Sequence, residues 1–236
     1  MRTEAQHRPR RRQLSDEASS YVRGLIMSGE LPPGTSVRPE TIGEALDIST
    51  TPAREALQAL RVEGFLELVP RKGFLVAPLT GEDIRDLFQA QALLAGELAA
   101  RAAQRAADAD LRELEALHHE LIAAARREDH DLLEEKNHAF HRQINQIAGS
   151  RKITWAMSLV TRYVPRAFYA SIPGWPETTV EDHTALLEAI RAHDAERTRQ
   201  LMFEHIVRSG ALLAENFDQR VSGSDAADDD GDAPRS

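Results

Sequence analysis

The chain has 236 residues, of which 42% are hydrophobic and 28% charged, the balance of a soluble protein that can bury a sizeable core. It contains no cysteine, which excludes disulfides and thiolate ligands, so a metal must be held by His, Asn, Asp or Glu. No apolar run has the length of a membrane span or a signal peptide, so we expect a cytoplasmic protein with no membrane partner.

The net charge of −9 divides unevenly along the chain. Residues 1–79 carry 11 Lys+Arg and 10 Asp+Glu, whereas residues 80–236 carry 18 and 28. The first part is therefore nearly neutral and the second strongly acidic. This asymmetry favours a division of the chain into an N-terminal module and an acidic partner domain.

The N-terminal 80 residues begin with a basic, polar stretch, and we predict a disordered arm over residues 1–13. It is either a mobile tail or an arm that contacts DNA phosphates or a minor groove. Apolar residues at helical spacing predict a first helix from about Leu14 to Ser28. Pro32 to Gly34 form a turn, and Pro39 opens a short second helix.

A third helix has clear end signals. Thr51 is a suitable N-cap, Pro52 suits the first helical position, and Gly64 suits the residue after the last turn. Two short β-type runs follow, Phe65–Val69 and Phe74–Ala77, joined by a basic turn. Helix, turn, helix and hairpin in this order predict a winged helix-turn-helix over residues 14–79.

Five residues of this module are candidate DNA contacts. Thr50 and Thr51 can hydrogen-bond bases or phosphates at the start of the third helix, and Arg54 can reach a guanine edge or a phosphate. Arg71 and Lys72, at the tip of the hairpin, are placed to contact the DNA backbone. The alternative is a winged helix that contacts only protein.

After Pro78 the strand signals vanish, and the fold is predicted to be mostly α. We expect an antiparallel bundle of about six helices over residues 80–220, followed by an acidic disordered tail over residues 221–236. The amphipathic segments are Ile84–Arg105, Asp110–Arg127, Asp131–Ala148, Ile153–Ala170, Glu177–Ala192 and Ala195–Phe217.

Three histidines of the bundle form a candidate metal site. Asn137 and His141 are four residues apart, so they project from one helix face. His183 and His205 lie on the last two helices, which can bring both imidazoles to one point. Such a set suits Zn, Ni or Mn, although isolated histidines are commonly core or surface residues. We assign three others to solvated helix faces or ends: His118, His119 and His193.

The N-terminal segment resembles the GntR family of bacterial transcription regulators. The matching residues are Gly29–Gly34, Ile48–Leu57, and Leu60 with Glu63-Gly64. The resemblance implies a homodimer that binds double-stranded DNA at a palindromic operator. The family usually has a guanine-reading arginine where this chain has Thr50, so we expect the operator core to differ.

The second part resembles the FCD ligand-binding domain found in the FadR branch of that family. The matching residues are Phe140–Arg142, Ala148–Ser150, Asp182-His183, Leu186–Ile190 and Met202–His205. The resemblance implies a divalent metal held by an Asp or Asn four residues before the first histidine, by that histidine and by two later ones. These positions are Asn137, His141, His183 and His205 in this chain.

The resemblance also implies a small organic-acid effector, but its usual arginine is missing. The family often carries Arg-x-x-Leu-Glu in the first bundle helix, where this chain has Gln91 and Ala95 at the charged positions. Arg162 and Arg166 are candidates to pair with an anionic effector, or are solvated surface arginines.

We therefore predict a transcription repressor, not an enzyme, that is released from DNA by an effector bound beside a metal. One alternative is a metal-free regulator whose bundle only dimerises. Another is a metal-dependent hydrolase, which would leave the winged helix unexplained.

Overall fold

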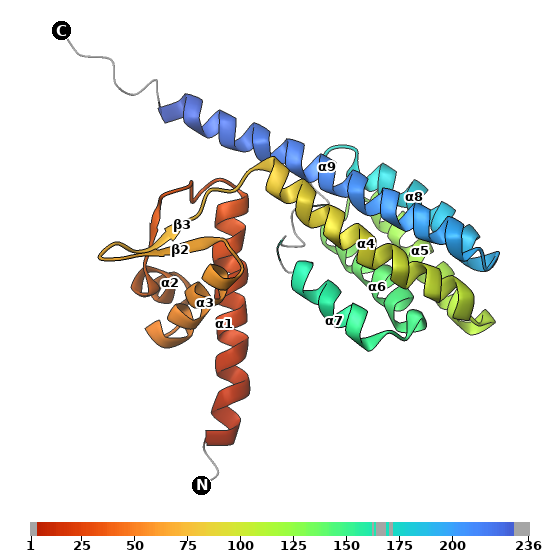
Figure 1. Cartoon of the computed structure of the whole chain (residues 1–236), viewed down its shortest axis with the longest axis horizontal. Helices are drawn as coiled ribbons and strands as arrows, with labels where there is room; N and C mark the ends of the chain where they lie inside the picture. Colours follow the sequence, from red (N-terminus) through yellow and green to blue (C-terminus); the bar gives the residue numbers. More distant parts are fainter. Residues whose placement is uncertain (1–3, 162, 164–168, 170–171, 229–236) are drawn as a thin grey trace. The chain divides into compact units, whose positions relative to one another are not determined.

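The computed structural model describes residues 4–161, 163, 169 and 172–228, and these residues form two compact units. The first unit is built chiefly on the chain up to Thr80, and the second on the chain from Gly81 to Asn216. Figure 1 labels the elements of both units. Within the described part of the chain, no helix is both long enough and apolar enough to cross a membrane.

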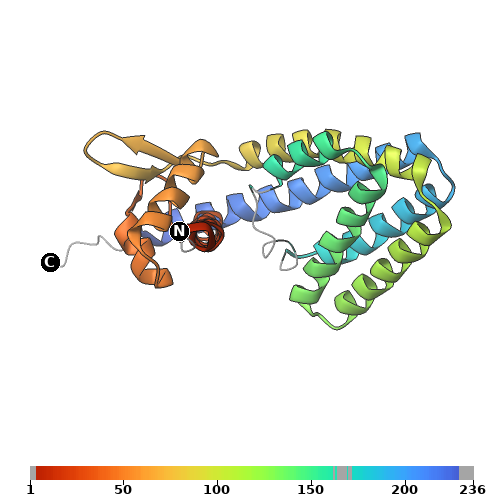
Figure 2. The ribbon, with the colours of Figure 1, turned by 90° about the horizontal axis from the view of Figure 1, so that it is seen from below.

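The first unit is a winged helix-turn-helix, as the sequence predicts. Its elements are α1 (Glu4–Met27), β1 (Ser36–Val37), α2 (Pro39–Leu46), α3 (Thr50–Val62), β2 (Leu66–Val69) and β3 (Gly73–Val76). Helices α1 and α2 pack against α3 and bury apolar stripes that include Val22 and Leu57. The strands form an antiparallel sheet in the order β1-β3-β2, and the β2–β3 hairpin protrudes from its unit (Figure 2). Sequence reasoning missed β1, because a two-residue strand has no readable periodicity.

The first helix begins ten residues earlier than predicted, at Glu4 instead of Leu14. The predicted disordered arm over residues 1–13 is therefore helical from Glu4 onward, and residues 1–3 lie outside the described residues. A tertiary contact accounts for part of this difference. Arg11 donates from Nε to Oε2 of Glu55 on α3, at 3.1 Å, and composition near the N-terminus does not reveal such a partner.

The third helix starts at Thr50, with Ser49 in an extended conformation as its N-cap. The predicted N-cap, Thr51, is instead the second helical residue, and Pro52 is the third. Proline is tolerated there because the first-turn N–H groups have no partner within the helix. Gly64 follows the helix with φ of +87°, which fits the predicted C-terminal glycine.

The turn between α2 and α3 depends on Gly43. A Cβ atom at this position would lie 2.9 Å from the backbone oxygen of Ile48, closer than van der Waals contact allows. Ile48 also donates its N–H to the Gly43 carbonyl at 2.9 Å. The absence of a side chain therefore permits the close approach that sets α3 against α2.

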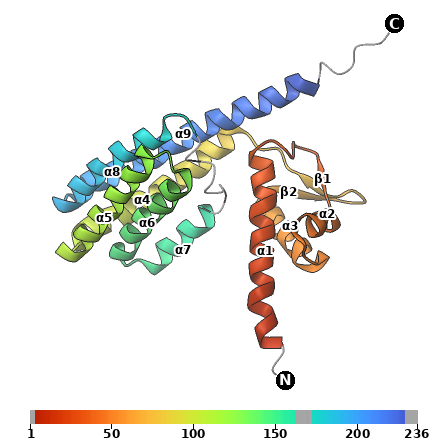
Figure 3. The same ribbon diagram turned by 180° about the vertical axis from the view of Figure 1, so that it is seen from behind.

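The second unit is a helical bundle, and its described residues contain six helices. They are α4 (Gly81–Arg105), α5 (Asp108–Arg126), α6 (His130–Ala148), α7 (Arg151–Val160), α8 (Trp175–Arg191) and α9 (Ala195–Asp228). Helix α5 lies between α6 and α8, and α4 packs against α6, α7 and α8 (Figure 3). Buried side chains such as Leu98, Leu121 and Ile190 form its core.

Two helices of the bundle differ in length from the predictions. Helix α7 ends at Val160, whereas the sequence predicts a helix to about Ala170. Helix α9 continues to Asp228, beyond the predicted end at Phe217 and into the predicted disordered tail. Periodicity is a weak guide at helix ends, where termination depends on partners distant in sequence.

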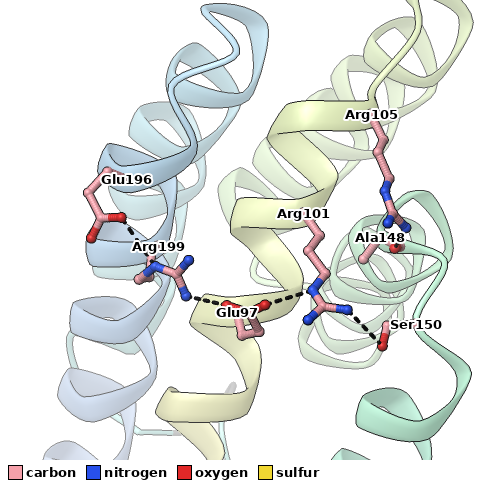
Figure 4. Close-up of polar contacts among 7 residues, drawn as sticks. All are labelled: Glu97, Arg101, Arg105, Ala148, Ser150, Glu196 and Arg199. Carbon is pink, nitrogen blue, oxygen red and sulfur yellow. Dashed lines mark hydrogen bonds and ion pairs between the residues drawn. The ribbon is translucent and has the colours of Figure 1, made fainter.

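A charged network joins α4 to its neighbours (Figure 4). Glu97 of α4 accepts a hydrogen bond from Nε of Arg101 at 2.7 Å and forms a second ion pair with Arg199 of α9. Arg101 in turn donates to the Ser150 hydroxyl at 3.4 Å, and Arg105 donates to the backbone carbonyl of Ala148. Glu97 therefore connects α9 to the α6–α7 turn through α4.

We expect the free energy of unfolding to fall less in acid for Glu97→Gln than for the wild type. Hydrogen bonds from Arg199 and Arg101 lower the pKa of Glu97 below its ordinary value of 4.5. Since the folded-state pKa is the lower one, this stabilisation is complete above pH 4.5 and is lost as the pH falls through the folded value.

When thermal unfolding is measured as the pH is lowered below 4.5, the melting temperature should decline less steeply for Glu97→Gln than for the wild type. At neutral pH the variant should lose about 1 kcal/mol or less, because the side chain is one-third exposed. Glu188→Gln, at an exposed position on α8, is the matched control and should follow the wild-type curve. Identical curves for all three proteins would contradict the prediction.

Candidate functional site

The predicted DNA-contacting side chains are all exposed. Helix α3 buries one face through Pro52, Ala53, Ala56, Leu57 and Leu60, which leaves the opposite face free. Thr50, Thr51 and Arg54 lie on that outer face. The Arg54 side chain is 61% exposed, and its Nη2 atom lies 3.7 Å from Oε1 of Glu40 on α2. This loose, solvated pair leaves the guanidinium available for a ligand.

The hairpin tip carries its two basic residues in an unusual turn. Lys72 donates its N–H to the Val69 carbonyl at 3.1 Å, and Arg71 lies between them with φ of +66°. Glycine or asparagine normally holds such a left-handed position, so turn geometry alone does not favour arginine.

The bundle brings the three predicted imidazoles together. His141 of α6, His183 of α8 and His205 of α9 each offer a ring nitrogen, and these atoms lie within 4.8 Å of one another. The Nε2 atoms of His141 and His205 are 3.3 Å apart, and the two rings stack with centroids 5.2 Å apart. His183 is fully buried and stacks on Phe140 at 4.2 Å between centroids.

Several polar atoms at this point lack a partner. The Oδ1 atom of Asn137 is buried without a hydrogen bond among the described residues, and so are both ring nitrogens of His183. A buried polar atom costs roughly 1–3 kcal/mol when it is left unpaired, so a bound ion or water is the ordinary explanation. The orphaned atoms of Asn137 and His183 are nitrogen and oxygen donors, which suit a divalent transition metal.

Burial sets the protonation of the cluster. It lowers the pKa of His141 and of His183 well below the ordinary imidazole value, and the neighbouring His205 lowers both further. Both rings are therefore neutral at physiological pH and present a lone pair, the form that binds metals.

One histidine assigned to a solvated face is in fact buried. His118 of α5 is 4% exposed, and its Nε2 atom lies 2.9 Å from the Thr184 hydroxyl oxygen. Its ring centroid is 6.2 Å from that of His183, and burial lowers its pKa. The signal was available in the sequence, because Leu114, His118 and Leu121 share one helical face. His119 and His193 are exposed, as predicted, although His193 Nδ1 is also 2.7 Å from the Ala103 carbonyl oxygen.

Sequence reasoning also missed two polar side chains on α8. Thr179 and Trp175 precede His183 by one and two helical turns, so the three residues lie along one face. Each is buried, and neither Oγ1 of Thr179 nor Nε1 of Trp175 has a partner among the described residues. The predicted effector arginines, Arg162 and Arg166, lie outside the described residues.

Both parts of the chain match known families. A winged helix-turn-helix followed by a helical bundle is an architecture found in DNA-binding transcription regulators. Residues 14–76 match the family described as bacterial regulatory proteins, gntR family, and residues 86–208 match the FCD domain. The chain therefore belongs to the GntR family of DNA-binding transcriptional regulators, which are not enzymes, and it carries an FCD domain.

Named relatives support this assignment. The chain is 23% identical over 196 residues to the HTH-type transcriptional repressor RspR of Escherichia coli, across 82% of this chain and 86% of that protein. It is 23% identical over 220 residues to the HTH-type transcriptional regulator LutR of Bacillus subtilis, across 84% of this chain and 100% of that protein. A 30% identical match to an uncharacterized HTH-type regulator of Agrobacterium vitis covers 82 residues, and the chain spans only about half, 48%, of that relative.

A solved structure has the same fold. The structure of E. coli McbR/YncC superposes with a TM-score of 0.66 at 24% sequence identity, across 86% of this chain and 98% of that one.

Proposed function

We propose that this regulator is a cytoplasmic, homodimeric repressor that leaves its palindromic operator when a small organic acid binds beside a divalent metal. Residues 14–79 serve as the DNA-binding domain, and residues 80–220 serve as the sensing and dimerisation domain. The convergence of His141, His183 and His205 at one buried point supports this proposal most directly.

The metal is held by Asn137, His141, His183 and His205. Three imidazoles and one amide oxygen suit Zn, Ni or Mn. The amide is the weakest ligand because it is neutral, but its Oδ1 atom is buried without a partner among the described residues, and a bound cation would supply one. When bound, the metal supplies a positive charge that attracts carboxylate oxygens.

The effector is an acid that also needs hydrogen-bond donors. The Thr179 hydroxyl and the Trp175 indole N–H are buried on the same face of α8 as His183, and both can donate to a carboxylate or hydroxyl oxygen. Arg162 and Arg166 remain candidates for a second ionic contact. An anion held by neutral donors and a metal is compatible with a buried site, because its charge is compensated there.

Exposed apolar side chains support the homodimer. Leu93 on α4 and Trp155 and Leu159 on α7 are 62%, 61% and 50% exposed, and these two helices pack against each other. Where exposed apolar side chains form one contiguous patch, that patch commonly marks a protein–protein interface. A two-fold dimer through this region presents two winged helices to a palindromic operator.

Elemental analysis of the purified protein tests the metal. We expect about one divalent metal ion per chain in the wild type, and none in His183→Ala. His119→Ala, which changes an exposed histidine, should keep the wild-type metal content. If no sample contains or takes up Zn, Ni or Mn, the chain is a metal-free regulator whose bundle binds an effector unaided or only dimerises.

Operator binding tests the sensor. Metal-loaded and chelator-treated protein should be titrated with small mono- and dicarboxylates while DNA release is followed. We expect release by at least one acid from the loaded protein, and a much weaker response after metal removal. Release that needs metal alone, without any acid, would show that the metal itself is the signal.

We expect the double change Arg71→Ala with Lys72→Ala to weaken binding to all DNA sequences. Both side chains are exposed at the hairpin tip, where they would contact phosphates without reading bases. The plot of log affinity against log salt should become shallower by roughly 0.9 for each phosphate that the hairpin no longer neutralises. Arg126→Ala with Arg127→Ala removes two exposed charges at the end of α5 and is the control. An unchanged salt slope would remove the hairpin from the DNA interface.

A further inference from the structure

Asp182, the residue before His183, links α8 to α9 beside the proposed metal site. Asp182 lies on α8, and its carboxylate reaches two side chains of α9. Its Oδ2 atom is 3.0 Å from Nδ1 of His205, and its Oδ1 atom accepts a hydrogen bond from Nη1 of Arg208 at 2.8 Å. The Asp182 side chain is only 15% exposed, so these contacts are partly shielded from water.

The carboxylate determines which nitrogen of His205 is free. A carboxylate only accepts hydrogen bonds, so the Nδ1 atom of His205 must carry the proton. In the neutral ring the lone pair then lies on Nε2, which is the atom 3.3 Å from Nε2 of His141. The hydrogen bond therefore turns the metal-binding edge of His205 toward the other two imidazoles.

Asp182 is not placed to be a ligand itself. Its carboxylate contacts the Nδ1 edge of His205, opposite the Nε2 edge that faces the cluster. Arg208, one helical turn beyond His205, engages the other carboxylate oxygen. With both oxygens occupied from α9, the Asp182 side chain has a fixed orientation and its charge is compensated.

We propose that Asp182 is a positioning residue that orients His205 for metal binding, and that Arg208 holds Asp182 in place. The adjacent pair Asp182-His183 then contributes one ligand directly and aligns another through its carboxylate. Of the three clustered imidazoles, His205 has a hydrogen bond between its Nδ1 atom and a carboxylate, whereas both ring nitrogens of His183 have no partner among the described residues. This inference rests on the proposed metal site, and a carboxylate behind a ligating histidine is a common means of raising metal affinity.

Metal affinity gives the first test. The dissociation constant for Co²⁺ and Zn²⁺ should be measured by competition with a chromophoric chelator in the full chain. We expect Asp182→Ala to weaken binding by about 10–100-fold. Glu181→Gln, which removes an exposed charge next to Asp182, should leave the affinity unchanged. Wild-type affinity in Asp182→Ala would overturn the proposal.

The role of Arg208 is tested by comparing single and double substitutions of Arg208 and Asp182. Arg208→Gln should weaken metal binding less than Asp182→Ala, because it loosens the carboxylate without removing it. In the Asp182→Ala background the same change should cause no further weakening, since the two residues act through one contact. Fully additive effects would show that Arg208 acts independently of Asp182.

The tautomer of His205 gives a readout that needs no metal. In metal-free protein labelled with nitrogen-15 in histidine, NMR at alkaline pH should find the His205 proton on Nδ1. Asp182→Ala should shift it toward Nε2, which is the position favoured in free imidazole, whereas Asp182→Asn should keep the fold and give a mixture. A proton on Nε2 in the wild type would overturn the proposal.

The two measurements separate the inference from the metal site itself. The wild type could bind no metal and still carry the His205 proton on Nδ1, while Asp182→Ala does not carry it there. That result would contradict the proposed metal function and would support the orienting contact between Asp182 and His205.

Discussion

We expect replacement of Arg54 by alanine to abolish specific operator binding while leaving both units folded. The guanidinium lies on the exposed face of α3, one turn from its N-terminus, where helices of this kind reach base edges. A bidentate contact to guanine contributes about 1–3 kcal/mol of discrimination, and the proposed dimer would lose it at both half-sites. Each 1.4 kcal/mol corresponds to a tenfold change in affinity, so the combined effect is large.

This effect is measured by footprinting and by titration of operator and unrelated DNA. Arg61→Ala is the matched control, since it removes an exposed arginine from the last turn of the same helix. Arg54→Ala should bind operator and unrelated DNA alike, whereas Arg61→Ala should retain preference for the operator. A wild-type footprint with Arg54→Ala would mean that α3 does not read bases through this residue.

Thr50 makes the Arg54 result especially informative. This chain lacks the arginine that resembling regulators usually carry at that position, so fewer base-reading cations remain on α3. We therefore attribute a larger share of the specificity to Arg54. Restoring the family residue with Thr50→Arg in the same titration shows whether the operator core shifts toward guanine.

We expect replacement of His141 by alanine to remove both the proposed metal and the stabilisation that it would supply. A ligand that binds only the folded state raises the free energy of unfolding by about 2.7 kcal/mol when its free concentration is about 100 times Kd. Wild-type protein should therefore melt at a higher temperature with Zn²⁺ than without it. His141→Ala should melt at the same temperature in both conditions.

The comparison with and without metal separates ligation from packing. Any difference between His141→Ala and the wild type in chelator reflects the packing of the imidazole against Phe140 and His205. His119→Ala, at an exposed position, should keep the full Zn²⁺ response. An undiminished Zn²⁺ response in His141→Ala would exclude this residue as a ligand.

The contributions of His141 and His183 to the Zn²⁺ response should not depend on pH near neutrality. Burial lowers the pKa of His141 and His183, so both rings stay neutral well below the ordinary imidazole value and need release no proton to bind a metal near neutrality. In the metal-free protein, these folded-state pKa values lie below the unfolded ones, so stability is complete above pH 6.5 and declines as the pH falls from there through the folded values.

Local patterns in the sequence were sufficient to predict the order of the helices and of the β2–β3 hairpin. The 3.6-residue periodicity and the Gly64 end signal identified α3 and the six segments of the bundle, because these depend on neighbours within a few residues. The three imidazoles could be named from spacing, and the resemblance to a known domain grouped them. Their convergence within 4.8 Å appears only when α6, α8 and α9 are packed together.

Contacts between distant residues decided the rest. Helix α1 starts at Glu4, and its residue Arg11 forms an ion pair with Glu55 of α3. Strand β1 exists only because β3 provides its hydrogen-bonding partners. Composition alone therefore misplaced the first and missed the second.

The site shows the same division. The sequence by itself determined a winged helix-turn-helix, a helical bundle and the residue types able to hold a metal. Only the tertiary structure decided that the ring of His118 lies beside that of His183, and that Asp182 lies behind the ring of His205. The physical reason is that burial and side-chain partners are set by packing between helices, whereas periodicity reports only which face of each helix is apolar.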